Sequence, residues 1–234
     1  MDNVIIDPRV AVVGVGGAGC NVISCVYDAV PFAEAIAINT DRESLRDVRA
    51  DKKLYICQSV TKGEGTKGDS VLGKRCAQAH LEEIEGAIAG NDAVFIVAGM
   101  GGGTGTGAAP IIAEISRRLG IMTFTIAVDP FSFESGRLDV ARNGIAKLKA
   151  ICPDTIVVEN DLMVSKMPDS SMRAILHSVN MSIASFIGRK VETIRQCLSA
   201  DFDRIVSEVV KSTAGTQEMP GSTLMSGVAK KITE

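Results

Sequence analysis

Short apolar runs alternate with longer amphipathic stretches along the first two thirds of the chain. Six of these runs are continuous rather than interrupted by polar residues, which is typical of strands covered on both faces of a parallel sheet. They are Val10–Val13, Ala35–Ile38, Leu54–Cys57, Ala93–Ala98, Met122–Val128 and Thr155–Val158. Helical patterns fill the gaps at Asn21–Ala29, Arg42–Arg46, Ser70–Ile88, Ala108–Leu119 and Leu138–Ala150. The pattern predicts an α/β fold: a doubly wound, mainly parallel six-stranded sheet with flanking helices.

The pattern changes after Asn160. Residues 168–171 (Pro-Asp-Ser-Ser) are suited to capping a long helix that extends to about Arg195, and a shorter helix is expected near 203–211. Residues 212–221 are rich in Ser, Thr, Gly and Pro and read as loop. The predicted organisation is a nucleotide-binding domain at 1–168, a long central helix at 169–198, and a loop, short helix and flexible end at 199–234.

Composition narrows the class of protein. A chain of 234 residues that is 46 % hydrophobic can bury a substantial core. The net charge of -3 and the lack of a basic stripe argue against nucleic-acid binding. The apolar runs are far shorter than the roughly 20 residues of a membrane span, so no direct membrane insertion is expected. Six cysteines without a CxxC pair, and a start that lacks a basic secretory signal, favour reduced thiols in a cytoplasm.

Two glycine-rich segments follow predicted strands. GGGTGTG at Gly101–Gly107 lies between a predicted strand and a predicted helix. Backbone N–H groups at a helix N-terminus, with no side chains in the way, form a site suited to binding phosphate. Gly14–Asn21 satisfies GxGxxG, and Asp41 could serve as the acidic residue that a dinucleotide site requires. A dinucleotide-dependent oxidoreductase therefore stays open, although it leaves the second loop unexplained. The P-loop string GxxxxGK[ST] does not occur.

Four strings together resemble the FtsZ/tubulin superfamily: GVGGAGCN (Gly14–Asn21), NTD (Asn39–Asp41), AGMGGGTGTGAAP (Ala98–Pro110) and PFSFE (Pro130–Glu134). They occur in the family's order, and the resemblance runs from about Val10 to Glu208. It implies a tubulin/FtsZ-type nucleotide domain followed by a long central helix. The first nucleotide loop would be formed by Gly16, Gly17, Ala18, Gly19, Cys20 and Asn21, with Asn21 reaching the base. The phosphates would be held by Gly101, Gly102, Gly103, Thr104, Gly105, Thr106 and Gly107.

The resemblance also implies residues near the ribose and the base. Glu134 matches a ribose-contacting glutamate, and a one-residue deletion makes Arg137 the nucleotide-facing arginine, with a surface ion pair as the alternative. Asn160 matches an asparagine near guanine but would equally suit a helix cap. On the long helix the counterpart is Asn180, although spacing also allows Ser178.

Two further loops are assigned by the resemblance. Asn39 and Asp41 fall in the second nucleotide loop, where Asp41 could instead cap the helix beginning at Arg42. Residues 61–69 fall in the third loop, which contacts the γ-phosphate in relatives. Thr66 and Lys67 could supply such contacts, or the segment could be a plain surface turn.

The expected hydrolytic loop departs from the family pattern. Residues 199–204 read SADFDR, so Asp201 is kept but Arg204 stands where an acid is expected. Arginine stays protonated and cannot act as a base toward water. Asp201 and Asp203 are the candidate catalytic residues, with helix capping as their alternative role. Relatives also continue into a further domain, whereas this sequence ends at Glu234, so weak or absent hydrolysis is expected.

The resemblance implies binding of GTP or GDP with Mg²⁺, and no residue is assigned as a protein metal ligand. It implies a cytoplasmic protein of the prokaryotic cell-division cytoskeleton that associates head to tail with itself or with FtsZ. A nucleotide-sensing regulator or cap of FtsZ filaments is the alternative. An NAD(P)-dependent oxidoreductase is a remote third possibility.

Overall fold

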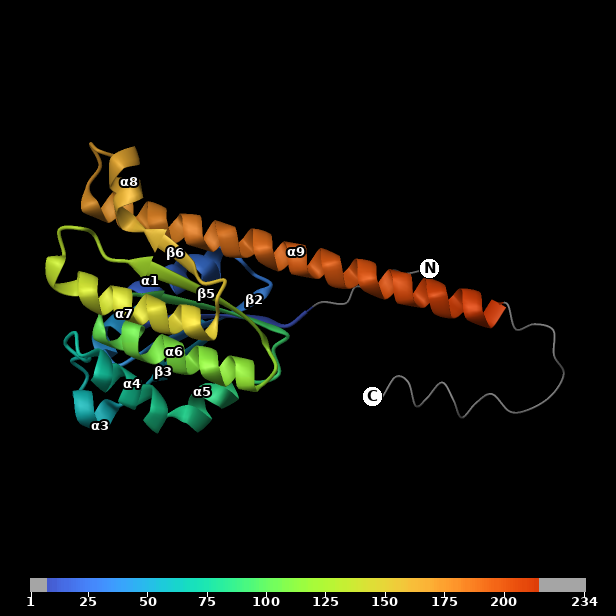
Figure 1. Ribbon diagram of the computed structural model, residues 1–234, viewed down its shortest axis with the longest axis horizontal. Helices are drawn as coiled ribbons and strands as arrows, with labels where there is room; N and C mark the ends of the chain where they lie inside the picture. The colour runs from blue at the N-terminus through green and yellow to red at the C-terminus, as the bar shows by residue number, and fades with distance from the viewer. Residues whose placement is uncertain (1–7, 215–234) are drawn as a thin grey trace. The chain divides into compact units, whose positions relative to one another are not determined.

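A six-stranded parallel sheet forms the centre of the fold, as the sequence predicts (Figure 1). The computed structural model describes the backbone of residues 8–214 and the side chains of residues 8–197. The strand order is β3-β2-β1-β4-β5-β6. The strands are β1 (Val10–Val15), β2 (Ala33–Asn39), β3 (Lys52–Tyr55), β4 (Ala93–Gly99), β5 (Met122–Asp129) and β6 (Ile156–Glu159). All six predicted strands are confirmed, and none of their ends shifts by more than two residues.

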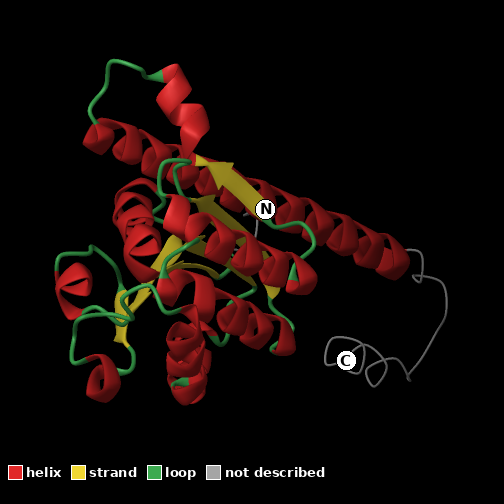
Figure 2. Cartoon of the chain, turned by 60° about the vertical axis from the view of Figure 1, so that its left-hand side comes forward, coloured by secondary structure: helices red, strands yellow, loops and turns green. Residues whose placement is uncertain are grey.

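Nine helices are present in the described part of the chain (Figure 2). They are α1 (Gly16–Ala29), α2 (Arg42–Arg46), α3 (Gln58–Thr61), α4 (Ser70–Ala79), α5 (Leu81–Ile88), α6 (Gly103–Arg118), α7 (Ser135–Ile151), α8 (Asn160–Lys166) and α9 (Met172–Ala214). The short helices α3 and α8 are not apparent from the pattern. The predicted helix Ser70–Ile88 is divided at His80, whose Nε2 accepts a hydrogen bond from the Cys57 amide at 2.8 Å.

Helices cover both faces of the sheet, and alternate strand residues supply the two cores. Val13 and Ile96 pack on the face covered by α4, α5, α6 and α7. Val12 and Phe95 pack on the opposite face, against α1, α2 and the first half of α9. Every residue of β1 is buried. This explains why the strand reads as a continuous apolar run, since both of its faces are covered.

Helix α9 differs from the sequence prediction. Among the described residues, 8–194 form one compact unit, and 195–214 belong to a second, of which the structure describes only the helix. The helix continues through residues 199–204, where a loop was expected. That prediction is wrong for the backbone, because no Gly or Pro occurs between Arg189 and Ala214 to end the helix. The domain boundaries at 168 and 198 stay predictions, and residues 215–221 of the expected terminal loop lie outside the described residues.

A disulfide joins Cys57 and Cys76, whose Cα atoms are 5.2 Å apart. The prediction that all six cysteines are reduced is therefore wrong for this pair. Nineteen residues separate the two along the chain, and only the packing of α4 brings them together. Of the other cysteines, Cys20 is free and fully buried, and burial raises the pKa of its thiol to about 12. In the part of the chain that the structure describes, no helix is long and apolar enough to cross a membrane.

Candidate functional site

A cleft of about 390 Å³ opens at the carboxyl ends of β1 and β4. These two strands are neighbours, and the chain leaves them toward opposite sides of the sheet, so the cleft lies at the switch point where open α/β sheets bind ligands. Helices α1 and α6 both begin at its floor, at Gly16 and Gly103. Their N-terminal N–H groups and dipoles make this end of the sheet favourable for an anion.

The glycines of the cleft divide into two kinds. Gly16 has a φ of 72°, and a Cβ built there lies 2.9 Å from the Gly105 amide nitrogen, so this glycine lets the two loops touch. Gly17 and Gly102 also line the cleft, but a Cβ on either meets nothing within 4 Å. The bare backbone at these two positions therefore borders open space, where a ligand could approach it.

Three threonine hydroxyls tie the loops around the cleft together. Thr104 Oγ1 lies 2.7 Å from Thr40 Oγ1 and 3.3 Å from Thr66 Oγ1, and all three residues are buried. Thr40 follows β2, Thr66 lies in the predicted third loop, and Thr104 lies in GGGTGTG. This network fixes the three segments relative to one another. No local pattern in the sequence predicts this network, because the residues are up to 64 positions apart.

Asn39 adds an unsatisfied polar group beside this network. The residue is 2 % exposed, and its Oδ1 accepts a hydrogen bond from the Thr40 amide at 2.8 Å. Its Nδ2 is buried without a partner among the described atoms. A buried donor without a partner costs about 1–3 kcal/mol. Because Asn39 lines the cleft, a ligand acceptor would remove that cost.

The third loop contributes a charged rim. Lys67 forms an ion pair with Glu64, which lowers the pKa of that carboxyl, and both line the cleft. Glu64 also makes a short antiparallel bridge with Asp41. Asp41 Oδ1 accepts from the Ser44 amide at 2.8 Å and so caps α2. The capping role suggested for Asp41 is confirmed, and the residue also lines the cleft.

A second pocket of about 330 Å³ adjoins the cleft and shares Ala18, Gly99, Met100 and Arg137 with it. Its lining is mostly apolar and includes Phe131, Phe133, Met172 and Leu176. The rings of Phe131 and Phe133 stack with centroids 5.1 Å apart, and Phe133 is 66 % exposed. Such a surface suits a flat heteroaromatic ring.

Polar groups lie at the edges of this second pocket. Asn160 lines it, is 6 % exposed, and has an Oδ1 without a partner among the described atoms. Asp129, at the end of β5, also lines it, and burial raises the pKa of its carboxyl, with a further contribution from Glu159. These oxygens are acceptors for donors on a bound ring.

An ion pair stands where the two hollows meet. Arg137 lines both of them, and its guanidinium lies 2.5 Å from Glu134 Oε2. The other carboxylate oxygen of Glu134 accepts from the Phe131 amide at 3.2 Å. The ion pair foreseen as the alternative role for Arg137 is present, and it lies at the site rather than away from it.

Other residues assigned by the resemblance lie elsewhere. Cys20 is in the core, with its thiol directed to the carbonyls of Gly14 and Ile38. Asn21 is exposed on α1, and Asn180 is half-buried on α9. Seven described residues that the resemblance assigned to the nucleotide line neither the cleft nor the second pocket: Gly19, Cys20, Asn21, Gly101, Thr106, Gly107 and Asn180. The side chains of Asp201, Asp203 and Arg204 lie outside the described residues.

Several lining residues were not predicted. Ser44 carried no signal in the sequence, whereas Met100 and Phe133 lie within the strings Ala98–Pro110 and Pro130–Glu134 but had no role assigned to them. Among the described residues, no group of three or more His, Cys, Asp or Glu side chains could hold a metal ion.

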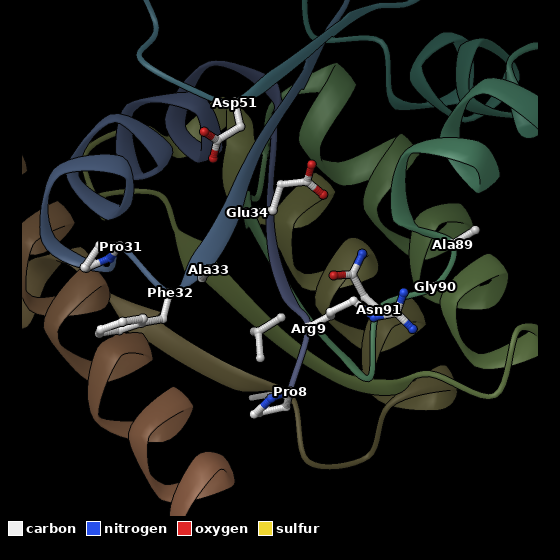
Figure 3. Close-up of a pocket in the computed structure, with 11 residues that line it drawn as sticks. Pro8, Arg9, Pro31, Phe32, Ala33, Glu34, Asp51, Ala89, Gly90 and Asn91 are labelled. Atoms are coloured by element: carbon white, nitrogen blue, oxygen red, sulfur yellow. The ribbon is translucent and has the colours of Figure 1, made fainter. Parts of the chain in front are cut away.

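A larger cavity, of about 640 Å³, lies at the amino ends of the strands, on the side of the sheet away from the cleft (Figure 3). The acidic groups there have partners within the chain. Glu34 pairs with Lys52 at 2.8 Å, and Asp51 Oδ2 accepts from the Ala35 amide at 2.7 Å. Ligands of open α/β sheets bind at the carboxyl ends of the strands, so we place the functional site at the cleft.

Comparison with known proteins matches residues 9–168 to the profile described as Tubulin/FtsZ family, GTPase domain. The cell division protein FtsZ 2 of Methanocaldococcus jannaschii is 35% identical over 189 residues, 80% of this chain and 50% of that protein. The cell division protein FtsZ of Neisseria gonorrhoeae is 42% identical over 166 residues, 70% of this chain and 42% of that protein. The chain thus spans about half the length of the curated relatives it matches.

Solved structures agree with this match. An empty FtsZ dimer from M. jannaschii has a TM-score of 0.76 at 34% identity and covers 80% of this chain and 55% of that one. CetZ2 from Haloferax volcanii, in a GTPgS bound protofilament, has a TM-score of 0.70 at 25% identity, with 80% of this chain and 59% of that one covered.

Proposed function

The chain belongs to the tubulin/FtsZ family of GTPase domains, and from that premise we propose that its cleft and second pocket together bind one guanine nucleotide. The observation that carries the proposal is the pairing of two unlike hollows that share Arg137. One is polar and lies at two helix N-termini, and the other is apolar and aromatic. A nucleotide has the same two halves, a phosphate chain and a flat base.

The phosphates fit the cleft. The open backbone at Gly17 and Gly102 offers N–H groups without side chains in the way, and the Thr104 hydroxyl lies beside them. Positive helix ends favour an anion by about 0.3–1 kcal/mol each, and more where the site is partly buried. Lys67 lines the rim in an ion pair with Glu64, and its ammonium would approach the end of the phosphate chain.

The base fits the second pocket, between the aromatic pair and α9. Guanine presents an N1–H and an amino group side by side, and two donors of this kind match two acceptors. Asn160 Oδ1 and the Asp129 carboxylate supply them. Glu134, where the hollows meet, is placed to accept from ribose hydroxyls.

Mg²⁺ fits the same arrangement. It usually keeps several waters and is held by substrate phosphates and one or two carboxylates, so a dedicated protein cage is not required. Asp41 and Glu64 line the phosphate cleft and are the carboxylates that would take part. The ion would neutralise phosphate charge, while the two loops would hold the phosphates in position.

We propose that the protein hydrolyses GTP weakly or not at all on its own, because Arg204 occupies the position of an acid in the relatives' hydrolytic loop. We further propose a cytoplasmic role in the prokaryotic cell-division cytoskeleton, with head-to-tail association of copies of this chain. Association with FtsZ filaments as a nucleotide-sensing regulator or cap is the second candidate, favoured by the same altered loop.

The test begins with the nucleotide that co-purifies with the 234-residue chain, identified by chromatography after denaturation. GDP or GTP supports the proposal, whereas NAD(P) would favour an oxidoreductase and overturn it. Phosphate release is then followed as the protein concentration rises, because catalysis across a subunit contact is steeper than first order. Robust turnover would contradict the proposed weak hydrolysis. Sedimentation with and without FtsZ filaments separates a self-assembling subunit from a regulator.

A further inference from the structure

A third hollow, separate from the nucleotide site, lies between α4, α6 and α7. Its volume is about 530 Å³, within the roughly 300–1,000 Å³ of small-molecule sites. The floor and walls are mostly apolar, with Val71, Pro110, Ile111 and Ile151 among the lining residues. Val71 is 61% exposed, which is unusual for a valine and leaves an apolar wall open to solvent. We refer to this hollow as the α4–α6–α7 groove.

Thr106 and Pro110 of α6 give this groove polar features that a plain apolar gap between helices would lack. Thr106 lines it, is 5 % exposed, and has an Oγ1 without a partner among the described atoms. Pro110, one turn later, has no N–H, so the usual helical bond to the Thr106 carbonyl is not made. The carbonyl is an acceptor, so of these two groups only the Thr106 hydroxyl can donate to a ligand oxygen. Leaving that buried hydroxyl without an acceptor is costly, and a ligand oxygen would remove that cost.

The charges around the groove favour an anion. Lys74 on α4 and Lys147 on α7 both line it, and Glu114 on α6 is the acid among its lining residues. Within the described chain none of the three forms an ion pair, so these groups give the lining a net charge of +1. A monoanion with an apolar body complements such a surface, because the body covers apolar walls while the head approaches the ammonium groups.

We propose that the α4–α6–α7 groove is a binding site for a small amphipathic monocarboxylate. Its apolar chain lies along Pro110, Ile111 and Val71, its carboxylate is held by Lys74 and Lys147, and the Thr106 hydroxyl donates to one of its oxygens. The site is distinct from the nucleotide cleft, yet both use the first turns of α6. Thr104 lines the cleft and Thr106 lines the groove.

The experiment titrates decanoate into the nucleotide-free 234-residue chain by calorimetry, so that its outcome does not depend on nucleotide binding. One saturable site per chain is expected. Lys74→Glu and Lys147→Glu should each weaken binding roughly tenfold or more, because each removes a charge-assisted contact and adds repulsion. The matched control is Lys149→Glu, an exposed lysine of α7 that does not line the groove, and it should leave binding unchanged.

A second variant tests the apolar half. Ala150→Trp places a large ring into the groove from an exposed position and should abolish decanoate binding, with thermal unfolding showing that the chain still folds. Decyltrimethylammonium has a comparable chain and the opposite charge, and it should bind far more weakly. The proposal is overturned if decanoate does not saturate, if the cation binds as well, or if Lys149→Glu acts like Lys147→Glu. Chain dimerisation that competes with decanoate would instead assign the groove to a second copy and also overturn it.

Discussion

Gly17 and Gly19 lie in the same turn of α1 and in the same motif, but the structure predicts opposite effects for the same substitution. A Cβ on Gly17 meets nothing within 4 Å, whereas a Cβ on Gly19 lies 2.4 Å from the Val97 carbonyl oxygen. That distance is about 1 Å or more short of ordinary contact. Since the opposing atom belongs to the backbone of a central strand, it cannot move aside cheaply. Gly19 thus serves packing, and Gly17 serves the open cleft.

The expected magnitudes follow from these distances. Alanine is a better helix former than glycine by about 0.5–1 kcal/mol, so Gly17→Ala should raise the free energy of unfolding and the Tm by roughly 1–4 °C. Gly19→Ala should lower the free energy of unfolding by about 1–3 kcal/mol or more through overpacking. Yet Gly17→Ala should weaken GDP binding by roughly tenfold or more, because the methyl group enters the space of the phosphates.

The assay compares thermal unfolding of nucleotide-free protein with a calorimetric GDP titration. Gly86→Ala is the matched control: it is an exposed helical glycine of α5, and its Cβ also meets nothing within 4 Å. It should stabilise the protein to a similar extent and leave GDP affinity unchanged. If Gly17→Ala and Gly86→Ala bind GDP equally well, the phosphates do not lie against Gly17, and the placement of the phosphates in the cleft is wrong.

Three further outcomes are expected. Reducing the Cys57–Cys76 disulfide should lower the free energy of unfolding by about 3 kcal/mol, because the bond closes a loop of moderate length; urea unfolding with and without reductant measures this, and no difference would contradict it. Thr104→Val should cost about 1–3 kcal/mol in the same assay, since it leaves two buried hydroxyls without their shared partner; a loss well below that range would show that the network does not stabilise the loops. Burial raises the pKa of Asp129, so the folded chain holds that proton to higher pH than the unfolded chain, and stability falls as pH rises from about 3.9 to the folded pKa. Asp129→Asn should therefore be more stable than the wild type at neutral pH, and this advantage should disappear in acid. If the free energy of unfolding of Asp129→Asn depends on pH as that of the wild type does, the pKa of Asp129 is not raised in the folded chain.

The sheet could be predicted because strands that are buried on both faces consist of continuous runs of apolar residues. Helix starts were harder to predict. The pattern placed the start of the sixth helix at Ala108, but α6 begins at Gly103, five residues earlier. Glycine is a poor helix former in isolation. In this fold a Cβ at Gly105 would lie 2.3 Å from the Gly99 carbonyl, so tertiary packing requires glycine within the helix.

The site could be predicted in part. The motif strings contain some of the residues that border the cleft, such as Gly17 and Gly102, because backbone approach requires glycine at specific points. They also contain residues that do not border it, such as Gly19 and Gly107. The second pocket and the threonine network depend on contacts between distant segments, such as Thr40 with Thr104, and no local pattern encodes those. For the long helix, the local sequence was a better guide than the family resemblance. A family resemblance suggested a loop at residues 199–204, while the local residue types there contain no helix breaker and the helix continues.

The GGGTGTG segment shows why membership of a motif does not by itself assign a residue to a ligand. Successive helical residues turn by about 100°, so two positions that are two residues apart are rotated by about 200° and face nearly opposite sides of the helix. Thr104 and Thr106 are such a pair in the first turns of α6, and the first lines the nucleotide cleft while the second lines the α4–α6–α7 groove. A phosphate ligand can contact only one side of this helix start. The other side must pack against the neighbouring helices or bind something else, and the unpartnered hydroxyl of Thr106 favours binding.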